Sequence, residues 1–508
     1  MSGGRAAHAI APGLRGALMV CGTSSGAGKS TFVTGLCRLL ARRGIRVAPF
    51  KAQNMSNNAA VCADGAEIGR AQYAQALAAG IEPCADLNPV LLKPIDERRS
   101  QVIVLGTPVG ETDAAAYADD TAALLDIATA AFDRLRDGYD VVVLEGAGSP
   151  AELNLLHRDI ANLALAARVG TDALLVADVD RGGMLAAVHG TVDLLPAALR
   201  RHLRGIVVNR FRGELTLLDP GLAMLEERTN LPVLGVVPVL PGAVDIEDSL
   251  DVPTATDARS GALTIVVVRT PRLANFTDVE PLAAEPGVEV RFVTRPEQVE
   301  GADLIVLGGS RSVIADLSWL RETGLADAVL HSDAAVLGVC GGYQMLGHTI
   351  VDEVGADGPP GEAAGLGLLP VITTFAVEKT TRRRRGCALD ADVTGYEIRH
   401  GSPVRTGGRG WVDLDDEHGR ELEGAVAVGR VYGTSVHGLF ENDGFRGAFL
   451  AAVARARGRH LTAGSGSFAA TRRRFHDTVA DAVEAHLDLD AIAALIAGAR
   501  RPEPAPSR

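Results

Sequence analysis

Short apolar runs rich in β-branched residues recur along the first half of the chain, and stretches with helical spacing separate them. Strands that are buried on both faces have this composition, and their alternation with helices is typical of a parallel sheet covered by helices on both sides. The pattern therefore predicts an α/β fold, with strands at Ala17–Cys21, Ile45–Pro49, Val102–Leu105, Val141–Leu144, Ala173–Ala177, Gly205–Val208 and Val233–Val237.

A second series of such runs follows at Leu263–Val268, Val288–Val293, Asp303–Leu307 and Ala335–Val339. The segment between the two series is rich in Asp, Pro, Ser and Thr and has little helical period, so it predicts a linker. Turn residues between Gly365 and Gly438 predict antiparallel strands added to the second domain, and Phe475–Ala499 has helical spacing.

We therefore expect two doubly wound α/β domains with mainly parallel sheets. Their predicted boundaries, with the flanking segments, are a flexible N-terminus at 1–16, the first domain at 17–240, the linker at 241–261, the second domain at 262–450, and a C-terminal helical extension and tail at 451–508.

Bulk composition limits the kinds of partner. A formal net charge of −13 disfavours a nucleic acid or an anionic membrane held by general electrostatics. The six cysteines include no C-x-x-C pair, which is typical of reduced thiols. No uncharged apolar run reaches the roughly 18 residues of a membrane helix, and none near the start suits a signal peptide. We expect a cytoplasmic protein without nucleic-acid or membrane partners, and formation of a homo-oligomer stays open.

A glycine-rich loop follows the first predicted strand and opens an amphipathic segment. It runs Gly-Thr-Ser-Ser-Gly-Ala-Gly-Lys-Ser from Gly22 to Ser30. Backbone N–H groups of such a loop converge on phosphate oxygens, a lysine adds a mobile cation, and a serine can ligate magnesium. The loop predicts a nucleotide site, and the alternative is a strand-to-helix turn without a ligand. The residues expected to bind the nucleotide here are Thr23, Gly26, Gly28, Lys29, Ser30 and Thr31.

Carboxylates end two of the later strands of the first domain. Glu145 and Asp178 lie at strand ends, on the edge where α/β sheets bind ligands. Because Mg²⁺ prefers oxygen ligands, the predicted metal site consists of Ser30, Glu145 and Asp178. The alternative for Glu145 is a carboxylate that caps the following loop.

A cysteine follows the predicted strand Ala335–Val339. Glycines on both sides of Cys340 permit a sharp strand-to-helix turn that presents the sulfur, while N–H groups such as that of Gly341 face a developing oxyanion. The nearby helix N-terminus favours the thiolate. We predict Cys340 to be a nucleophile, with a buried inert thiol as the alternative. His437 lies between a strand and a glycine, where its ring can project from the sheet edge as the base.

Cys340 and His437 together resemble the catalytic pair of class I glutamine amidotransferases, which have a flavodoxin-like fold. The resemblance implies that the cysteine attacks the amide of glutamine and that the histidine moves protons. Leu439 stands where the usual glutamate would be, which implies a Cys-His dyad. Leu307–Ser312 is similar to the oxyanion loop, with Gly309 as the N–H donor, although Gly308 replaces a frequent proline.

The first domain resembles the dethiobiotin synthetase-like group of P-loop NTPases, because Thr23 replaces the first glycine of the strict loop pattern. Blocks along nearly the whole chain are similar to the cobyric acid synthase family of cobyrinate amidotransferases: Phe50–Asn58, Glu67–Gln72, Asn88–Pro94, Val208–Gly213 and Gly395–Gly401, the last with Arg399 in place of a frequent histidine.

The family resemblance implies ATP- and glutamine-dependent amidation of four carboxylates of a cobyrinic acid diamide, through an acyl phosphate. It adds Asn209 to the nucleotide site and suggests a corrinoid site at Lys51, Gln53, Asn54, Asn57 and Lys93. Asn and Gln suit such a substrate because they both donate and accept hydrogen bonds, and Asx-type turns are the alternative. We also expect a sheltered path for ammonia between Cys340 and the P-loop domain.

Three other functions are alternatives. The first is cobyrinic acid a,c-diamide synthase, against which the block Asn54–Asn58 argues. The second is a P-loop switch ATPase of the partitioning type, which leaves the cysteine domain unexplained. The third is a glutaminase-like domain kept only as a scaffold, which the joint presence of Cys340 and His437 disfavours.

Overall fold

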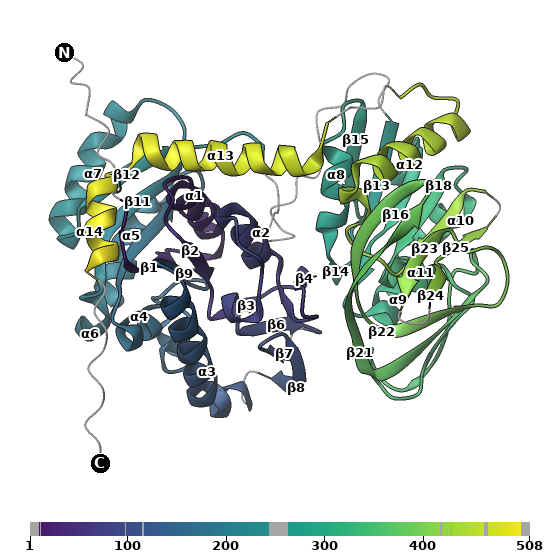
Figure 1. Cartoon of the computed structure of the whole chain (residues 1–508), viewed down its shortest axis with the longest axis horizontal. Helices are drawn as coiled ribbons and strands as arrows, with labels where there is room; N and C mark the ends of the chain where they lie inside the picture. Colours follow the sequence, from purple (N-terminus) through teal and green to yellow (C-terminus); the bar gives the residue numbers. More distant parts are fainter. Residues whose placement is uncertain are drawn as a thin grey trace.

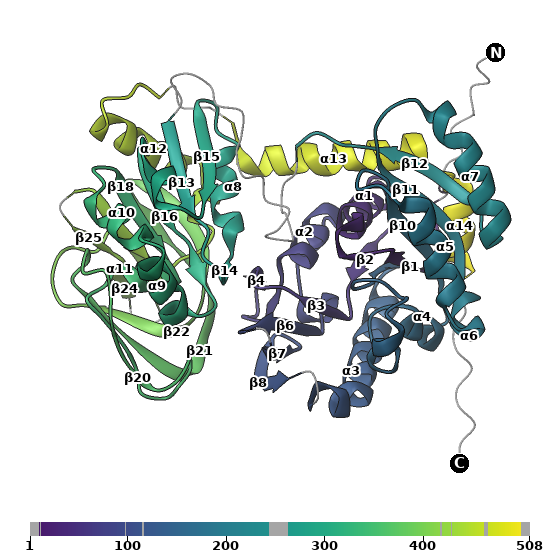
Figure 2. The ribbon, with the colours of Figure 1, turned by 180° about the vertical axis from the view of Figure 1, so that it is seen from behind.

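The computed structural model describes residues 10, 12–96, 98–113, 116–242, 263–416, 419–427, 429–461 and 466–498. Two α/β halves lie side by side, and a long helix, α13 (Phe468–His486), passes from one to the other (Figure 1, and from behind in Figure 2). Most of the predicted linker (241–261) and N-terminus (1–16), and the end of the tail, lie outside the described residues. Among the described helices, none combines the length and apolar character needed to cross a bilayer.

The first half is built on a six-stranded parallel sheet, which confirms the predicted sheet type. The strand order is β12-β11-β10-β1-β9-β2. The strands span Gly16–Gly22 (β1), Val47–Phe50 (β2), Val141–Glu145 (β9), Asp172–Asp178 (β10), Leu203–Phe211 (β11) and Val233–Pro238 (β12).

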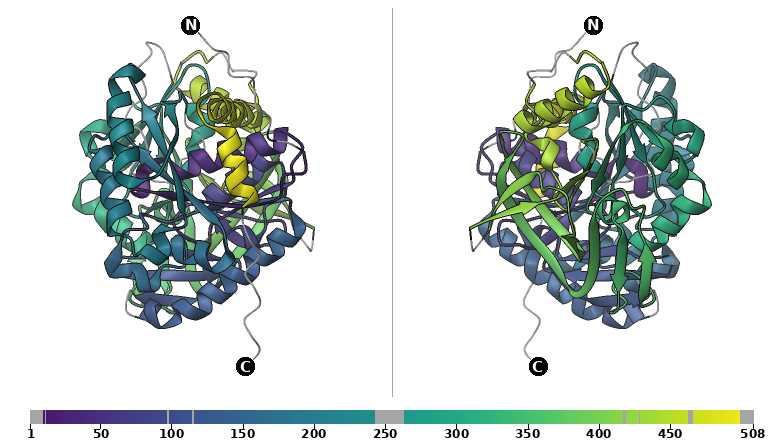
Figure 3. Two further views of the ribbon diagram at one scale, coloured as in Figure 1. Left: turned by 90° about the vertical axis from the view of Figure 1, so that its left-hand side faces the viewer. Right: turned by 90° about the vertical axis from the view of Figure 1, so that its right-hand side faces the viewer.

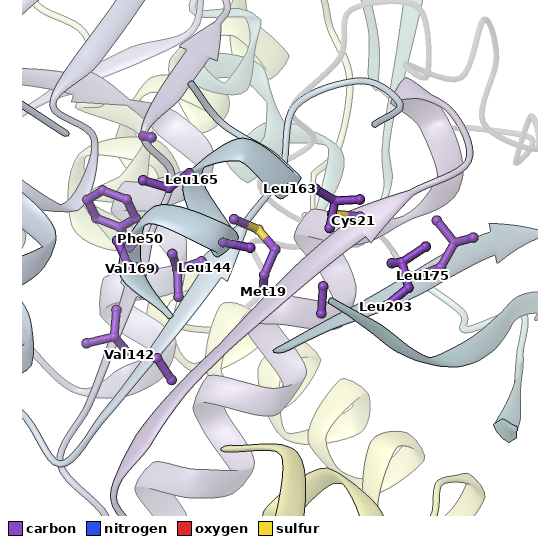
Figure 4. Packing of buried hydrophobic residues seen from close by; sticks show 14 of the residues in the cluster. Met19, Cys21, Phe50, Val142, Leu144, Leu163, Leu165, Val169, Leu175 and Leu203 are labelled. Carbon is purple, nitrogen blue, oxygen red and sulfur yellow. The ribbon is translucent and has the colours of Figure 1, made fainter. Parts of the chain in front are cut away.

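Helices cover both faces of this sheet. Leu18 and Val20 of β1 pack with α1 (Lys29–Arg42), whereas Met19 and Cys21 point into the opposite core, which includes α4 (Leu163–Val169). Figure 4 shows this second core, in which Met19 lies among Leu144, Leu163 and neighbouring side chains. Each buried leucine or methionine of this kind contributes about 1.5–3 kcal/mol, so the two layers hold the strand ends in fixed positions.

The remaining helices of this half lie mostly on the same side as α4 or at the sheet edges. They are α2 (Arg70–Ala79), α3 (Ala116–Gly138), α5 (Met184–Leu194), α6 (Ala197–Arg200) and α7 (Leu215–Thr229).

A separate four-stranded sheet of order β3-β6-β7-β8 lies beside the main one. The predicted strand Val102–Leu105 belongs here, so its assignment to the main parallel sheet was wrong. A short apolar run does not reveal its pairing partner, and the tight turn before β7 forces an antiparallel hairpin. The strands are β3 (Gln53–Met55), β6 (Val90–Pro94), β7 (Arg99–Val104) and β8 (Thr107–Asp113), and the nearby pair β4 (Ala59–Val61) and β5 (Glu67–Gly69) forms a small ribbon.

The second half contains another six-stranded sheet, of order β15-β13-β16-β18-β26-β25. All neighbours are parallel except β25 at the edge, in agreement with the predicted α/β fold. The carboxyl ends of its parallel strands therefore meet at one edge. The strands are β13 (Leu263–Val268), β15 (Val288–Val293), β16 (Leu304–Leu307), β18 (Ala335–Val339), β25 (Ala425–Ala427) and β26 (Val431–Thr434). Helices α9 (Val313–Glu322), α10 (Leu325–His331) and α12 (Asp443–Ala456) flank it.

The predicted antiparallel addition is present and is dominated by one long ribbon. Strands β21 (Val371–Ala388) and β22 (Ala391–Arg405) pair along most of their length, and both contact β4 of the first half. The sheet is completed by β19 (Thr349–Asp352), β20 (Gly361–Ala364), β23 (Val412–Asp416) and β24 (Gly419–Glu423).

The C-terminal segment returns to the first half. The predicted helix at 475–499 is two helices, α13 and α14 (Leu489–Ala497), because Leu487 leaves the helix and Asp488 caps the next one by accepting from Ala491 N. Figure 3 shows α13 nearly end on, with α14 turning along the first half. Ile492 and Ile496 are fully buried in the core that contains Leu18, so α14 completes the packing of the first half.

Candidate active sites

Cys340 occupies a strained turn between β18 and helix α11 (Gly341–Leu346). Its φ of 50° and ψ of −105° lie outside the regions that a residue with a side chain usually adopts. The turn needs glycine neighbours, because a Cβ on Gly338 would lie 2.6 Å from Tyr343 N and one on Gly342 would lie 1.9 Å from Leu307 O. Cys340 N donates to Thr434 O at 2.7 Å, which ties the turn to β26.

His437 lies just after β26 and meets the cysteine. The two side chains line the same pocket, and the imidazole stacks on Tyr396 with ring centroids 5.4 Å apart. Burial alone would lower the pKa of His437, but the Asp278 carboxylate and the Cys340 sulfur together raise it. The structure thus brings together the predicted nucleophile and base, with the imidazole ready to hold a proton.

Asp278 is a third member of this group that the sequence reasoning missed. Its Oδ2 lies 2.6 Å from His437 Nδ1, and its Oδ1 accepts from Gly438 N at 2.8 Å. The inference of a Cys-His dyad from Leu439 was therefore wrong, since the carboxylate comes from a different element, the short helix after β13. An acidic residue following the first strand of the domain, at the same sheet edge as Cys340, was the signal in the sequence.

The predicted oxyanion residues border the same turn. A Cβ on Gly309 would lie 3.1 Å from His437 Cε1, and a Cβ on Gly341 would lie 2.6 Å from Ser310 N. Gly341 is also the first residue of α11, where the backbone N–H has no acceptor within the helix. Their close approach is consistent with the expected donors, and their role stays a prediction.

The pocket around Cys340 has walls from both halves of the chain. It has a cavity volume of about 50 Å³, and Lys93 and Gln101 of the first half line it together with Cys340 and His437. Two groups of opposite charge in this lining were not predicted. Burial lowers the pKa of the Arg311 guanidinium, and burial raises the pKa of Asp357 to about 7, although Val313 N and Ile314 N donate to its carboxylate.

The glycine-rich loop takes a compact form between β1 and α1. Lys29 Nζ donates to Ser24 O at 2.9 Å and to Gly148 O at 3.1 Å. Gly28 has a φ of 88°, and a Cβ there would lie 2.1 Å from Asn209 Nδ2, which itself donates to Ala27 O. Asn209 therefore packs directly on the loop. Thr23, Gly26, Ser30 and Thr31 complete the predicted set, with Thr31 exposed at the start of α1.

Two of the three predicted metal ligands lie together. Ser30 Oγ donates to Glu145 Oε1 at 2.8 Å, and the same carboxylate binds Lys51 Nζ at 2.8 Å and Gln75 Nε2 at 2.6 Å. Asp178 instead forms an ion pair with Arg210, at 3.0 Å, on the other side of β1. A hydroxyl and a carboxylate are hard oxygen donors, and Ser30 and Glu145 lie close enough together to bind one magnesium ion, whereas Asp178 lies apart from them on β10.

The residues predicted to contact the acceptor do not form one cluster. Gln53 lines a cavity of about 520 Å³ that also reaches Ser25 and Gly148 beside the loop. Lys51 is engaged by Glu145, and Asn54 Nδ2 donates to Gln72 Oε1 at 2.9 Å. Asn57 Oδ1 is buried without a hydrogen-bond partner in the described part of the chain. Lys93 faces the Cys340 pocket and not the large cavity.

Comparison with known families agrees with this architecture. Residues 18–249 match the CobQ/CobB/MinD/ParA nucleotide binding domain, and residues 264–445 match the CobB/CobQ-like glutamine amidotransferase domain. Fold and domain content thus define a glutamine-hydrolysing, ATP-dependent amide ligase, in which an amidotransferase domain follows a nucleotide-binding domain.

Relatives over the full length specify the family. Proteins described as cobyric acid synthase are 50% identical in Saccharopolyspora erythraea (95% of this chain and 95% of the relative), 48% in Nocardia farcinica (94% and 96%) and 47% in Streptomyces coelicolor (95% and 97%). The chain belongs to the cobyric acid synthase family.

Proposed function

We propose that this chain amidates the b, d, e and g carboxylates of adenosylcobyrinic acid a,c-diamide, with nitrogen from glutamine and energy from ATP, to give cobyric acid. The observation that carries the proposal is the pocket in which Cys340, at a strained turn, meets a buried His437 and opens toward residues of the nucleotide-binding half. This arrangement suits the release of ammonia inside the protein, next to a second site that consumes it.

In the second half, we assign the chemistry of glutamine hydrolysis to Cys340, His437 and Asp278. His437 takes the thiol proton while the sulfur attacks the amide carbon, and it then gives that proton to the departing ammonia. Water, activated by the same imidazole, cleaves the thioester and releases glutamate. Asp278 keeps Nδ1 protonated through its 2.6 Å contact, so that Nε2 faces the sulfur.

Arg311 is our candidate for the group that binds the α-carboxylate of glutamine. Its guanidinium lines the Cys340 pocket, and its Nε is buried without a hydrogen-bond partner among the described residues. Asp357 lies in the same lining and suits the α-ammonium group. A pocket with one cation and one carboxyl group would discriminate an amino acid from a simple amide.

In the first half, an oxygen of the acceptor carboxylate attacks the γ-phosphorus of ATP, and ADP leaves. Ammonia then attacks the acyl phosphate, phosphate departs and the nitrogen loses a proton, which yields the amide. Lys29 stabilises charge on the transferred phosphoryl group. Magnesium, held by Ser30 and Glu145, would neutralise phosphate charge in the same place. The cavity lined by Gln53 is our candidate for the corrinoid site, because it adjoins the loop and is large enough for part of such a ligand.

We further propose a cytosolic location. All six cysteines are among the described residues and all are free thiols, which suits a reducing compartment and a nucleophile that must stay reduced.

The test is a turnover assay with purified protein, ATP and glutamine, in which either cobyrinic acid or its a,c-diamide is the acceptor. Fourfold amidation of the diamide, seen by mass spectrometry, supports the proposal, whereas amidation of only the a and c groups of cobyrinic acid contradicts it. Cys340→Ala should abolish activity with glutamine and keep activity with ammonium salts. Lys29→Ala should lose both, and full ammonia-dependent turnover in that variant would contradict the assigned ATP site.

A further inference from the structure

The small sheet of the first half forms a wall shared by the two candidate sites. Lys93 of β6 and Gln101 of β7 are paired across the hairpin and line the Cys340 pocket. Their neighbours Leu92 and Ser100 line the large cavity beside the P-loop. Because successive side chains of a strand point to opposite faces, one layer of backbone separates the source of ammonia from its point of use.

The same sheet packs on the residues that touch the catalytic pair. Leu91 and Ile103 share an apolar cluster with Tyr396 and Ile398 of β22. Tyr396 stacks on the His437 ring, and Ile398 O accepts from Cys340 Sγ at 3.6 Å. Docking of the sheet on the second half therefore bears directly on the position of the reacting groups.

A buried ionic cluster joins the halves at this wall. Glu67, which is fully buried, binds Lys93 Nζ at 2.7 Å from its own half and Lys379 Nζ at 2.5 Å from β21 of the other half. Lys379 also donates to Gln101 Oε1 at 3.1 Å, and Gln101 Nε2 lies 3.2 Å from His400 Nε2. A buried carboxylate held by two ammonium groups is costly to separate, so the cluster holds the wall against the pocket.

We propose that the Lys379–Glu67–Lys93 cluster is a clamp that seals the glutaminase pocket against the nucleotide-binding half, so that ammonia released at Cys340 reaches the acceptor and not the solvent. The inference rests on the proposed function. Lys379, Glu67 and Lys93 act here as positioning residues, because they hold the wall and do not touch the reacting atoms.

The net charge of the clamp also favours neutral ammonia over ammonium. Its two lysines and one glutamate carry a net positive charge, whereas Arg311 and Asp357 in the same pocket are groups of opposite charge. Among the groups facing it, burial lowers the pKa of His400 to about 4, which leaves that ring neutral. A positive lining disfavours protonation of ammonia to ammonium, and ammonia is the form that attacks an acyl phosphate.

Lys379→Met tests the clamp with little risk to the fold, because it leaves the neutral Glu67–Lys93 pair in place. Arg383→Met is the matched control. Arg383 lies on the same strand and also pairs with a glutamate of the first half, Glu82 at 2.8 Å, but this pair is at the exposed rim. Gln101→Met is a second test variant. It removes the hydrogen bonds that the side-chain amide makes to Lys379 and His400, without a change of charge.

The measured quantities are amide formed per glutamine hydrolysed and amidation supported by ammonium salts. In Lys379→Met and Gln101→Met, the amide-to-glutamate ratio should fall at least about twofold while ammonia-supported amidation stays near the wild-type rate. Arg383→Met should keep the wild-type ratio. An unchanged ratio in both test variants, or loss of ammonia-supported amidation in both, overturns the clamp. Failure of the wild-type chain to amidate the diamide at all would instead refute the proposed function.

Discussion

Replacement of Asp278 by asparagine should disable glutamine hydrolysis while leaving the rest of the protein intact. The new side chain has only one oxygen: if this oxygen accepts from Gly438 N, an NH₂ group faces His437 Nδ1, and if it accepts from Nδ1, the acceptor is neutral. The imidazole then loses the partner that fixes its tautomer, so Nε2 more often carries the proton and cannot accept one from Cys340.

The size of the effect follows from the lost contact. A hydrogen bond between charged groups, here 2.6 Å long and buried, contributes about 1.5–3 kcal/mol. Since about 1.4 kcal/mol corresponds to a factor of ten, kcat for glutamine hydrolysis should fall roughly 10- to 150-fold. The pKa of His437 should also move down, because the Asp278 carboxylate is one of the groups that raise it.

The assay compares Asp278→Asn with wild type for glutamine-dependent amidation, ammonia-dependent amidation and the pH profile of glutaminase. The ammonia-dependent rate should be unchanged, since that route does not use His437. A glutamine-dependent rate within about twofold of wild type would refute the assigned role of Asp278.

Further predictions concern binding, pH dependence and folding. Arg311→Met should raise the KM for glutamine with little change in the ammonia-dependent rate, and an unchanged KM would exclude it as the α-carboxylate ligand. Burial raises the pKa of Glu423 from 4.5 to about 7, so its contribution to stability is complete below pH 4.5 and is lost as pH rises through 7. The Tm of Glu423→Gln minus the Tm of wild type should therefore increase as the pH rises from 4.5 to about 7. A difference that stays constant with pH would contradict this. A chain that ends at Leu461 lacks α13 and α14 and should leave the first half unstable to heat, because Val483, Ile492 and Ile496 each contribute about 1.5–3 kcal/mol of burial. A Tm equal to that of the full chain would refute this packing argument.

Local patterns in the sequence predicted most of the fold. Strands such as Val141–Glu145 and Ala335–Val339 are apolar on both faces, so the sequence alone indicates a buried parallel sheet and the edge where function gathers. The pairing of Val102 could not be predicted, because a short run does not encode its neighbour.

That Cys340 and His437 share one pocket was predictable in the same local way, whereas the surroundings of the two residues were not. The glycines around Cys340 mark the turn in one stretch of sequence. Asp278 is 159 positions from His437, and Lys379 is 312 from Glu67, so only the folded chain reveals these contacts. Ion pairs between elements far apart in the chain produce no periodic pattern in the sequence, so they cannot be predicted from it.

The return of α13 and α14 has a consequence for how the protein is made. The nucleotide-binding half leaves the ribosome first, yet Ile492 and Ile496 at the far end fill its core. That half must wait, with part of its apolar surface exposed, until the whole second half and the residues up to Ile496 have been translated. Expressing the two halves as separate polypeptides divided at the linker would leave one without its last helices and the other with an unpaired apolar tail.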